Sequence, residues 1–204
     1  MIRYGQQEIT KDDIDAVVEV LMSANLTQGP KIEEFEKSVE DFTGAKKAFA
    51  VNSATSALHI SCLALELGPD DRLWTSPNSF VASANCALYC GASVSFVDID
   101  PDTYNMCPIS LEKKLIEAKY QGKLPKVVVP VHFSGQSCDM KAIYELSRFY
   151  GFSIIEDAAH AIGGKYKDRV IGGCKYSDIT VFSFHPVKII TTGEGGMALT
   201  NSEK

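Results

Sequence analysis

The stretch KVVVPVHFSGQSCDMKAIYELSRFYGFSIIED, residues 126–157, decides the fold class. It contains an apolar run at 126–131, a helical pattern of apolar residues at 139–150 and a second apolar run at 152–156. Short runs rich in β-branched residues are typical of buried strands, and two such strands joined by a helix form a βαβ unit. This stretch therefore predicts two strands of a parallel sheet that are connected by a helix.

The same alternation continues on both sides of this unit. Five further short apolar runs predict strands at 47–51, 73–75, 94–98, 179–183 and 197–200. Three further helices and one glycine-rich hairpin or loop are predicted at 54–67, 79–90, 110–120 and 163–173. We therefore expect an α/β fold with a mainly parallel, seven-stranded sheet flanked by helices.

The amino-terminal part of the chain has a different pattern. Apolar residues recur at helical spacing within 14–21 and again within 32–42, where the second stripe ends at Gly44. Thr10 and Asp13 have the spacing of a capping pair at the start of the first stripe. We expect a helical segment at 1–44, followed by the sheet-containing domain at 45–204.

Composition limits the classes of partner. The 204 residues are 45% hydrophobic, which suffices for the core of one α/β domain, and the formal net charge of -6 provides no basic stripe for nucleic acid. No stretch approaches the roughly 20 apolar residues that cross a bilayer, and the start MIRYGQQEIT lacks the pattern of a secretory signal. We expect a cytoplasmic enzyme with no nucleic-acid or membrane partner.

The six cysteines form no CxxC pair, and none lies beside a histidine at the spacing of zinc ligands. Most of them lie in apolar stretches, where a cysteine behaves as a small hydrophobic residue. We therefore expect reduced thiols and no metal site. The cysteines are Cys62, Cys86, Cys90, Cys107, Cys138 and Cys174.

Small hydroxyl residues follow the first predicted strand, in the sequence Asn52-Ser53-Ala54-Thr55-Ser56. Ligands of open α/β sheets bind beyond the carboxyl ends of the strands, and the free N–H groups of a helix's first turn favour an anion. The segment therefore has the composition of a phosphate site. Taken alone, the segment is more typical of an ordinary helix N-cap, so the phosphate site depends on the rest of the sequence.

An acid and a histidine follow the strand predicted at 152–156, in the sequence Glu156-Asp157-Ala158-Ala159-His160. A carboxylate beneath a pyridine ring would keep the ring nitrogen protonated, so that the ring could accept electrons. A helix-capping aspartate and a structural histidine are the alternatives that these residues alone leave open.

The segment FSFHPVKIITTGEGG, residues 182–196, contains the most specific signal. Its lysine, Lys188, lies between apolar residues and a glycine-rich turn, just beyond a predicted buried strand. Lysines prefer solvated surfaces, and apolar surroundings lower the pKa of an amine from its ordinary value of about 10.4. Such a lysine is suited to form a Schiff base with a carbonyl compound. Taken alone, however, an ordinary surface lysine is the simpler interpretation.

Together, these segments resemble the DegT/StrS family of sugar aminotransferases. The resemblance is carried by residues 52–56, by Asp157-Ala-Ala-His160, by Ser183-Phe-His-Pro-Val-Lys188 and by Thr192-Gly-Glu-Gly-Gly196. It covers the whole chain and is strongest to members that act on nucleotide-linked 4-keto-6-deoxy sugars, as in pseudaminic acid biosynthesis. The resemblance implies the large domain of a fold type I transferase that depends on pyridoxal 5'-phosphate (PLP), with 45–204 as its PLP-binding domain.

The resemblance also implies a role for individual residues around the cofactor. Lys188 would hold PLP as a Schiff base and act as the catalytic residue, Asp157 would pair with the pyridine nitrogen, and His160 would meet the phenolic oxygen. The aromatic ring of Phe80 would stack on the cofactor. The contacts to its phosphate would come from Ala54, Thr55 and Ser183.

Substrate contacts are implied nearer the amino terminus. The residues that would touch the sugar nucleotide are Tyr4, Asn25, Leu26, Thr27 and Ser53. L-glutamate would donate the amino group to the cofactor, which would pass it to C4 of the keto sugar. Dehydratases of the family replace the lysine, often by histidine, so Lys188 favours transamination. The family resemblance further implies a homodimer.

Family members continue into a small carboxyl-terminal domain, whereas this chain ends at Lys204. We therefore expect an enzyme truncated after its large domain. The alternative function is a non-catalytic fragment that acts only as a folding or oligomerising module. A nicotinamide-dependent oxidoreductase would also fit the α/β alternation, but no GxGxxG follows the first predicted strand.

Overall fold

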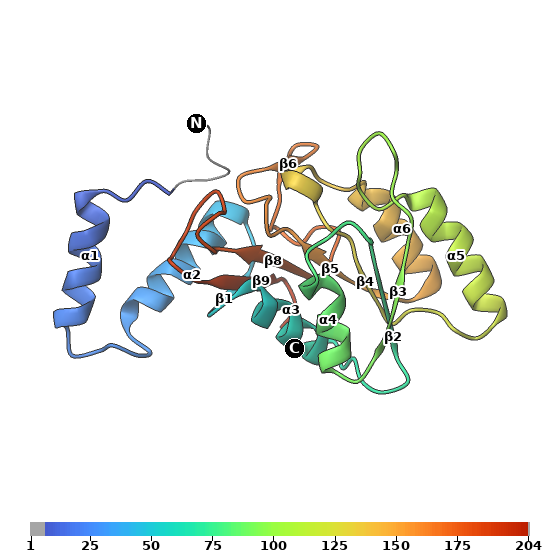
Figure 1. The fold of residues 1–204 in the computed structure, drawn as a ribbon, viewed down its shortest axis with the longest axis horizontal. Coiled ribbons are helices and arrows are strands. Elements are labelled where there is room, and N and C mark those ends of the chain that lie inside the picture. Colours follow the sequence, from blue (N-terminus) through green and yellow to red (C-terminus); the bar gives the residue numbers. More distant parts are fainter. Residues whose placement is uncertain (1–6, 204) are drawn as a thin grey trace.

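A seven-stranded sheet forms the centre of the structure, a computed structural model that describes residues 7–203 (Figure 1). The strand order is β1-β9-β8-β5-β4-β2-β3. All neighbours from β8 to β3 run parallel, whereas β9 is antiparallel to both β8 and β1, so the mainly parallel sheet is confirmed. The strands are β1 (Lys47–Val51), β2 (Arg72–Thr75), β3 (Ser93–Phe96), β4 (Val127–Val129), β5 (Ser153–Asp157), β8 (Ile179–Ser183) and β9 (Gly196–Thr200).

Helices connect the strands in the predicted order. A short 3₁₀ turn, η1 (Phe133–Gly135), follows β4, and the glycine-rich segment forms the predicted hairpin from β6 (Lys165–Tyr166) and β7 (Arg169–Val170). The α-helices of the described residues are α1 (Lys11–Met22), α2 (Pro30–Thr43), α3 (Ala54–Ala64), α4 (Ala82–Tyr89), α5 (Pro108–Tyr120) and α6 (Met140–Tyr150).

Some predicted boundaries are wrong, for identifiable reasons. Helix α3 ends at Ala64 and not at 67, because Glu66 adopts a φ of 57°, outside the helical range. Strand β4 ends at Val129 and not at 131, because Pro130 has no N–H for the ladder. Helix α4 begins at Ala82 and not at 79, so the residues between β2 and α4 form a loop at the edge of the sheet.

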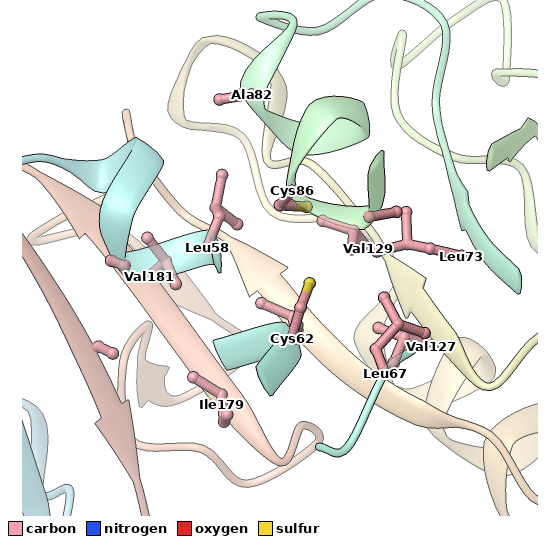
Figure 2. Packing of buried hydrophobic residues seen from close by; sticks show 14 of the residues in the cluster. Leu58, Cys62, Leu67, Leu73, Ala82, Cys86, Val127, Val129, Ile179 and Val181 are labelled. Carbon is pink, nitrogen blue, oxygen red and sulfur yellow. The ribbon is translucent and has the colours of Figure 1, made fainter. Parts of the chain in front are cut away.

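Helices cover both faces of the sheet. One apolar layer lies between the sheet and helices α3 and α4, and Figure 2 shows Leu58 and Cys62 of α3 and Cys86 of α4 within it. On the other face, α5 and α6 cover the half that contains β2, β4 and β5, while α2 covers β1, β9 and β8. The buried side chains of this three-layer arrangement make the core of the fold.

Alternation along the central strands decides which side chains face which layer. Ile155 of β5 and Val181 of β8 pack toward α3 and α4, whereas Ile154 packs toward α5 and α6. Because successive side chains of a strand point to opposite faces, Asp157 and Ser183 share the α3 and α4 side. Both of these residues end their strands, so they lie together at the carboxyl edge of the sheet.

The reversed direction of β9 brings its first residue to the same edge. Gly196 pairs with Val51 of β1 and with Ser183 of β8. A Cβ atom at Gly196 would lie only 2.3 Å from the backbone carbon of Ser53 and 2.4 Å from the backbone nitrogen of Ala54. Only glycine allows this approach, which holds the start of α3 against the end of the sheet.

Helix α1 lies apart from the sheet at one end of the molecule (Figure 1) and has no buried residue. Thr10 and Asp13 form the predicted capping box, since each side chain bonds to the other residue's backbone N–H. Along residues 7–203, no helix has the length and apolarity needed to span a bilayer.

Candidate active site

A cavity of about 760 Å³ opens at the edge where the parallel strands end. Ligands of open α/β sheets bind at this edge, and the loops after β1, β2, β5 and β8 converge here. Eight of the residues singled out from the sequence line the cavity, although they are spread over more than 130 positions of the chain. They are Ser53, Ala54, Thr55, Phe80, Asp157, His160, Ser183 and Lys188.

Asp157 is buried, with 5% of its surface exposed, yet it lines the cavity. Its Oδ1 accepts a hydrogen bond of 3.2 Å from the backbone N–H of Ala159, and its Oδ2 accepts one of 2.6 Å from the Ser83 hydroxyl. An ionised carboxylate offers about four acceptor positions, so these two bonds orient the group without saturating it. The remaining capacity of Asp157 is available to a cationic or N–H-bearing ligand.

The Lys188 Nζ lies 2.5 Å from the His160 Nε2. Partial burial of the amine lowers the pKa of Lys188, although the charge of Asp157 acts in the opposite direction. Burial likewise lowers the pKa of His160, and the positive charge of Lys188 lowers it further. The pair is therefore suited to sharing a proton, and the lowered pKa of Lys188 favours the unprotonated form that a reactive amine requires.

The loop that carries Lys188 is closed by hydrogen bonds at its base. The Phe184 N–H donates to the Gly195 carbonyl at 2.9 Å, and the Phe184 carbonyl accepts from the Thr192 N–H at 3.1 Å. The Lys188 N–H donates to the His185 carbonyl at 2.9 Å. These bonds pin both ends of the loop to the β8 and β9 junction and so fix the backbone from which the lysine side chain extends.

The first turn of α3 forms another wall of the cavity. Ser53 caps the helix, with its hydroxyl accepting from the Ser56 N–H at 3.2 Å. The N–H groups of Ala54 and Thr55 belong to the first turn of the helix, so they have no acceptor within the helix. Together with the helix dipole, these donors favour an anion. Ser183 also lines the cavity, and its partner on β9, Gly196, lies against the same start of α3.

Phe80 lies in the loop before α4 and is 74% exposed. The neighbouring Asn78 donates from Nδ2 to the Tyr104 carbonyl at 2.8 Å, which ties this loop to the segment after β3. Phe80 therefore offers an uncovered aromatic face at the cavity, with a surface on which a flat ring can pack.

Three of the other predicted substrate residues are not brought to the cavity. Asn25, Leu26 and Thr27 are exposed in the connection between α1 and α2 and are not among the residues that line it. Tyr4 lies outside the described residues. The proposed contacts of these four residues with a sugar nucleotide stay predictions.

Sequence reasoning missed several residues of the site. Ser79, His132, His185 and Glu194 line the cavity, and Ser83 lies behind it in contact with Asp157. No local signal was accessible for the contact between Ser79 and Ser83, because Ser79 lies in the loop before α4 and not on the helix. Nothing in the sequence indicates that His132 would face the cavity. In residues 7–203, no group of three or more His, Cys, Asp or Glu side chains is arranged to hold a metal ion.

Comparisons with known proteins identify relatives along the whole chain. The spore coat polysaccharide biosynthesis protein SpsC of Bacillus subtilis is 44% identical over 201 residues, which cover 98% of this chain and 50% of SpsC. UDP-4-amino-4,6-dideoxy-N-acetyl-beta-L-altrosamine transaminase of Campylobacter jejuni is 39% identical over 206 residues, covering 100% of this chain and 52% of that enzyme.

A solved structure agrees with the fold. The putative sugar aminotransferase Spr1654 of Streptococcus pneumoniae, in its PLP form, superposes with a TM-score of 0.88 at 32% identity and covers 99% of this chain and 53% of its own. The chain thus spans about half the length of the curated relatives that it matches. The model of the DegT/DnrJ/EryC1/StrS aminotransferase family matches residues 7–204. The chain belongs to this family.

Proposed function

We propose that the protein is a PLP-dependent aminotransferase that transfers an amino group from L-glutamate to a nucleotide-linked 4-keto-6-deoxy sugar. The observation that carries the proposal is Lys188, whose amine lies 2.5 Å from His160 in a cavity that also contains Asp157. Burial lowers the pKa of this amine, as covalent chemistry with an aldehyde requires.

The residues of the cavity fit the three chemically distinct parts of PLP. The aldehyde requires an amine, which Lys188 supplies, and the phosphate requires N–H and hydroxyl donors, which the first turn of α3 and Ser183 supply. The pyridine nitrogen requires an acidic partner, for which Asp157 has free acceptor capacity. His160 would meet the phenolic oxygen.

Bound PLP supplies an electron-accepting ring for amino-group transfer. The chain's own residues bind, orient and move protons. Lys188 would carry a proton between the substrate carbon and the cofactor, since its lowered pKa lets it act as base and acid. Asp157 would hold the ring nitrogen in its protonated form, and Phe80 would pack on the ring face.

The substrate class rests on the relatives, which include a UDP-sugar transaminase and a polysaccharide biosynthesis protein. We propose a role in amino-sugar biosynthesis for surface polysaccharide or pseudaminic acid. Ser53, at the cavity, would contact the sugar nucleotide, together with Tyr4 and the segment Asn25 to Thr27. The division into a segment at 1–44 and a PLP-binding domain at 45–204, a homodimeric state and a cytoplasmic location belong to the same proposal.

The experiment that tests this function is reduction of the protein–PLP complex with borohydride, followed by peptide mapping. We expect a visible absorption band with PLP, loss of the band on reduction, and the reduced cofactor on Lys188. Lys188→Ala should remove both the band and the labelled peptide. Label on an exposed lysine such as Lys165 or Lys175, or no band with the wild-type protein, would refute the assignment.

A further inference from the structure

Ser83 lies on α4, behind the cavity wall, and is fully buried, with 0% of its surface exposed. Its hydroxyl donates to Oδ2 of Asp157 at 2.6 Å, and its Oγ also lies 2.6 Å from the Oγ of Ser79. The three side chains form a short hydrogen-bonded chain that leads from the cavity wall to the carboxylate.

The direction of this chain follows from its chemistry. An ionised carboxylate can only accept, so the single proton of the Ser83 hydroxyl is directed toward Asp157. Ser83 therefore accepts the other bond, and Ser79 donates it. Each hydroxyl orders the next, which leaves the Asp157 side chain few orientations.

The opposite side of the carboxylate is held as well. Oδ1 of Asp157 accepts from the Ala159 N–H, so one bond comes from α4 and the other from the chain just after β5. Without Ser83, Oδ2 would lose its short donor in a buried environment, where a lost bond to a charged group is costly.

We propose that Ser83 is a positioning residue, which fixes the Asp157 carboxylate to face the ring nitrogen of the bound cofactor, with Ser79 ordering Ser83. The inference rests on the proposed PLP function, and it assigns Ser83, which is fully buried, a role that acts through Asp157. The positioning matters because a charge-assisted hydrogen bond depends steeply on its geometry.

The test compares PLP with an analogue in which carbon replaces the ring nitrogen. Dissociation constants of both compounds are measured by absorption titration of the wild-type protein and of Ser83→Ala. We expect Ser83→Ala to weaken PLP binding about tenfold, as for loss of a hydrogen bond to a charged group, and to change analogue binding less than twofold. Equal weakening of both compounds would mean a merely structural role and would overturn the proposal, as would unchanged binding of PLP.

Two further variants control the experiment. Ser61→Ala is the matched control, because Ser61 is also a buried helical serine but its hydroxyl bonds only to the Ala57 carbonyl in its own helix. It should leave both constants unchanged. Ser79→Ala, at a partly exposed position, keeps the test available if Ser83→Ala fails to fold, and should weaken PLP selectively by about threefold. If Ser79→Ala bound PLP and the analogue as tightly as the wild-type protein does, the result would contradict the proposed hydrogen-bonded chain from Ser79 through Ser83 to Asp157.

The two proposals fail in distinguishable ways. If the wild-type protein does not bind PLP, the proposed function fails. If it binds PLP through Lys188 but the Ser83→Ala and Ser79→Ala variants bind PLP as the wild type does, only the positioning role of Ser83 fails.

Discussion

Glu156 and Asp157 are neighbouring acids at the end of β5, yet the regions around them differ in kind. Glu156 points away from the α3 and α4 layer and is surrounded by three donors, which come from the loop after β4 and from the residues at and just before the start of β8. Its carboxylate accepts from the Nε2 of His132 at 2.9 Å, from Oγ1 of Thr180 at 3.1 Å and from the Ser177 hydroxyl. Asp157 points to the other face, toward the cavity, and accepts two bonds.

The tautomer of His132 follows from its second contact. Its Nδ1 accepts from the Cys138 N–H at 3.2 Å, so the ring proton is on Nε2 and is donated to Glu156. Burial opposes ionisation of Glu156, but its bonds from His132, Ser177 and Thr180 outweigh burial and lower its pKa. Glu156 thus ties the loop after β4 to β8 and has little capacity left for a ligand.

The two acids therefore differ in how much hydrogen-bond acceptor capacity remains free on the carboxylate, and not in the kind of side-chain group or in burial. Both are more than nine-tenths buried, and both lie at the end of the same strand. Glu156 is satisfied within the protein and contributes stability, whereas Asp157 is oriented but unsaturated and faces the cavity. Substitutions at the two positions should therefore separate function from stability.

The largest effect is expected for Asp157→Asn. This substitution should slow transamination by the complete protein about 100-fold or more, because the ring nitrogen would lose a preorganised anionic partner. Its thermal unfolding should change less than that of Glu156→Gln, since asparagine keeps an oxygen for the Ser83 donor and only the weaker bond from the Ala159 N–H is lost. Turnover assays measure the loss of rate, and calorimetry measures thermal unfolding. Asp168→Asn, at an exposed position, is the matched control. Near-normal turnover would contradict the role of Asp157.

The opposite pattern is expected for Glu156→Gln. Glutamine retains one acceptor oxygen and introduces an amide that faces the donors of His132, Ser177 and Thr180, so the variant should lose about 2 kcal/mol of unfolding free energy. PLP binding should change much less. Denaturant unfolding measures the loss, with the exposed Glu112→Gln as control. A selective loss of PLP affinity at unchanged stability would reverse the comparison between the two acids.

The sequence predicts this arrangement only in part. The apolar alternation predicts the seven strands, and therefore that Lys188, Asp157 and the start of α3 meet at one edge. Strand periodicity also implies that Glu156 and Asp157 face opposite sides. Which side contains the cavity depends on the packing of α3 and α4, and the donors to both acids come from segments remote in the sequence, such as Ser83, 74 positions before Asp157. Local patterns contain no information on such contacts.

The smallest effect concerns the acid dependence of the Glu156 region. A carboxyl group whose pKa is lower in the folded state than in the unfolded chain contributes stability above its unfolded value of 4.5, and this contribution is lost as the pH falls toward the folded value. His132 donates from Nε2 whether neutral or protonated, and Cys174, whose pKa burial raises to about 12, stays protonated throughout. The contribution of the Glu156 carboxyl group to the stability difference between the wild-type protein and Glu156→Gln should therefore be complete above pH 4.5. Below pH 4.5 it should shrink by at most about 1.4 kcal/mol per pH unit, because the other carboxyl groups cancel in the comparison.

The change should stay smaller than the substitution's own effect, since protonation removes the charge but leaves both oxygens in place. Unfolding curves of both proteins between neutral and acidic pH measure it. A difference that grows below pH 4.5 would mean that burial, and not the three donors, sets the pKa of Glu156.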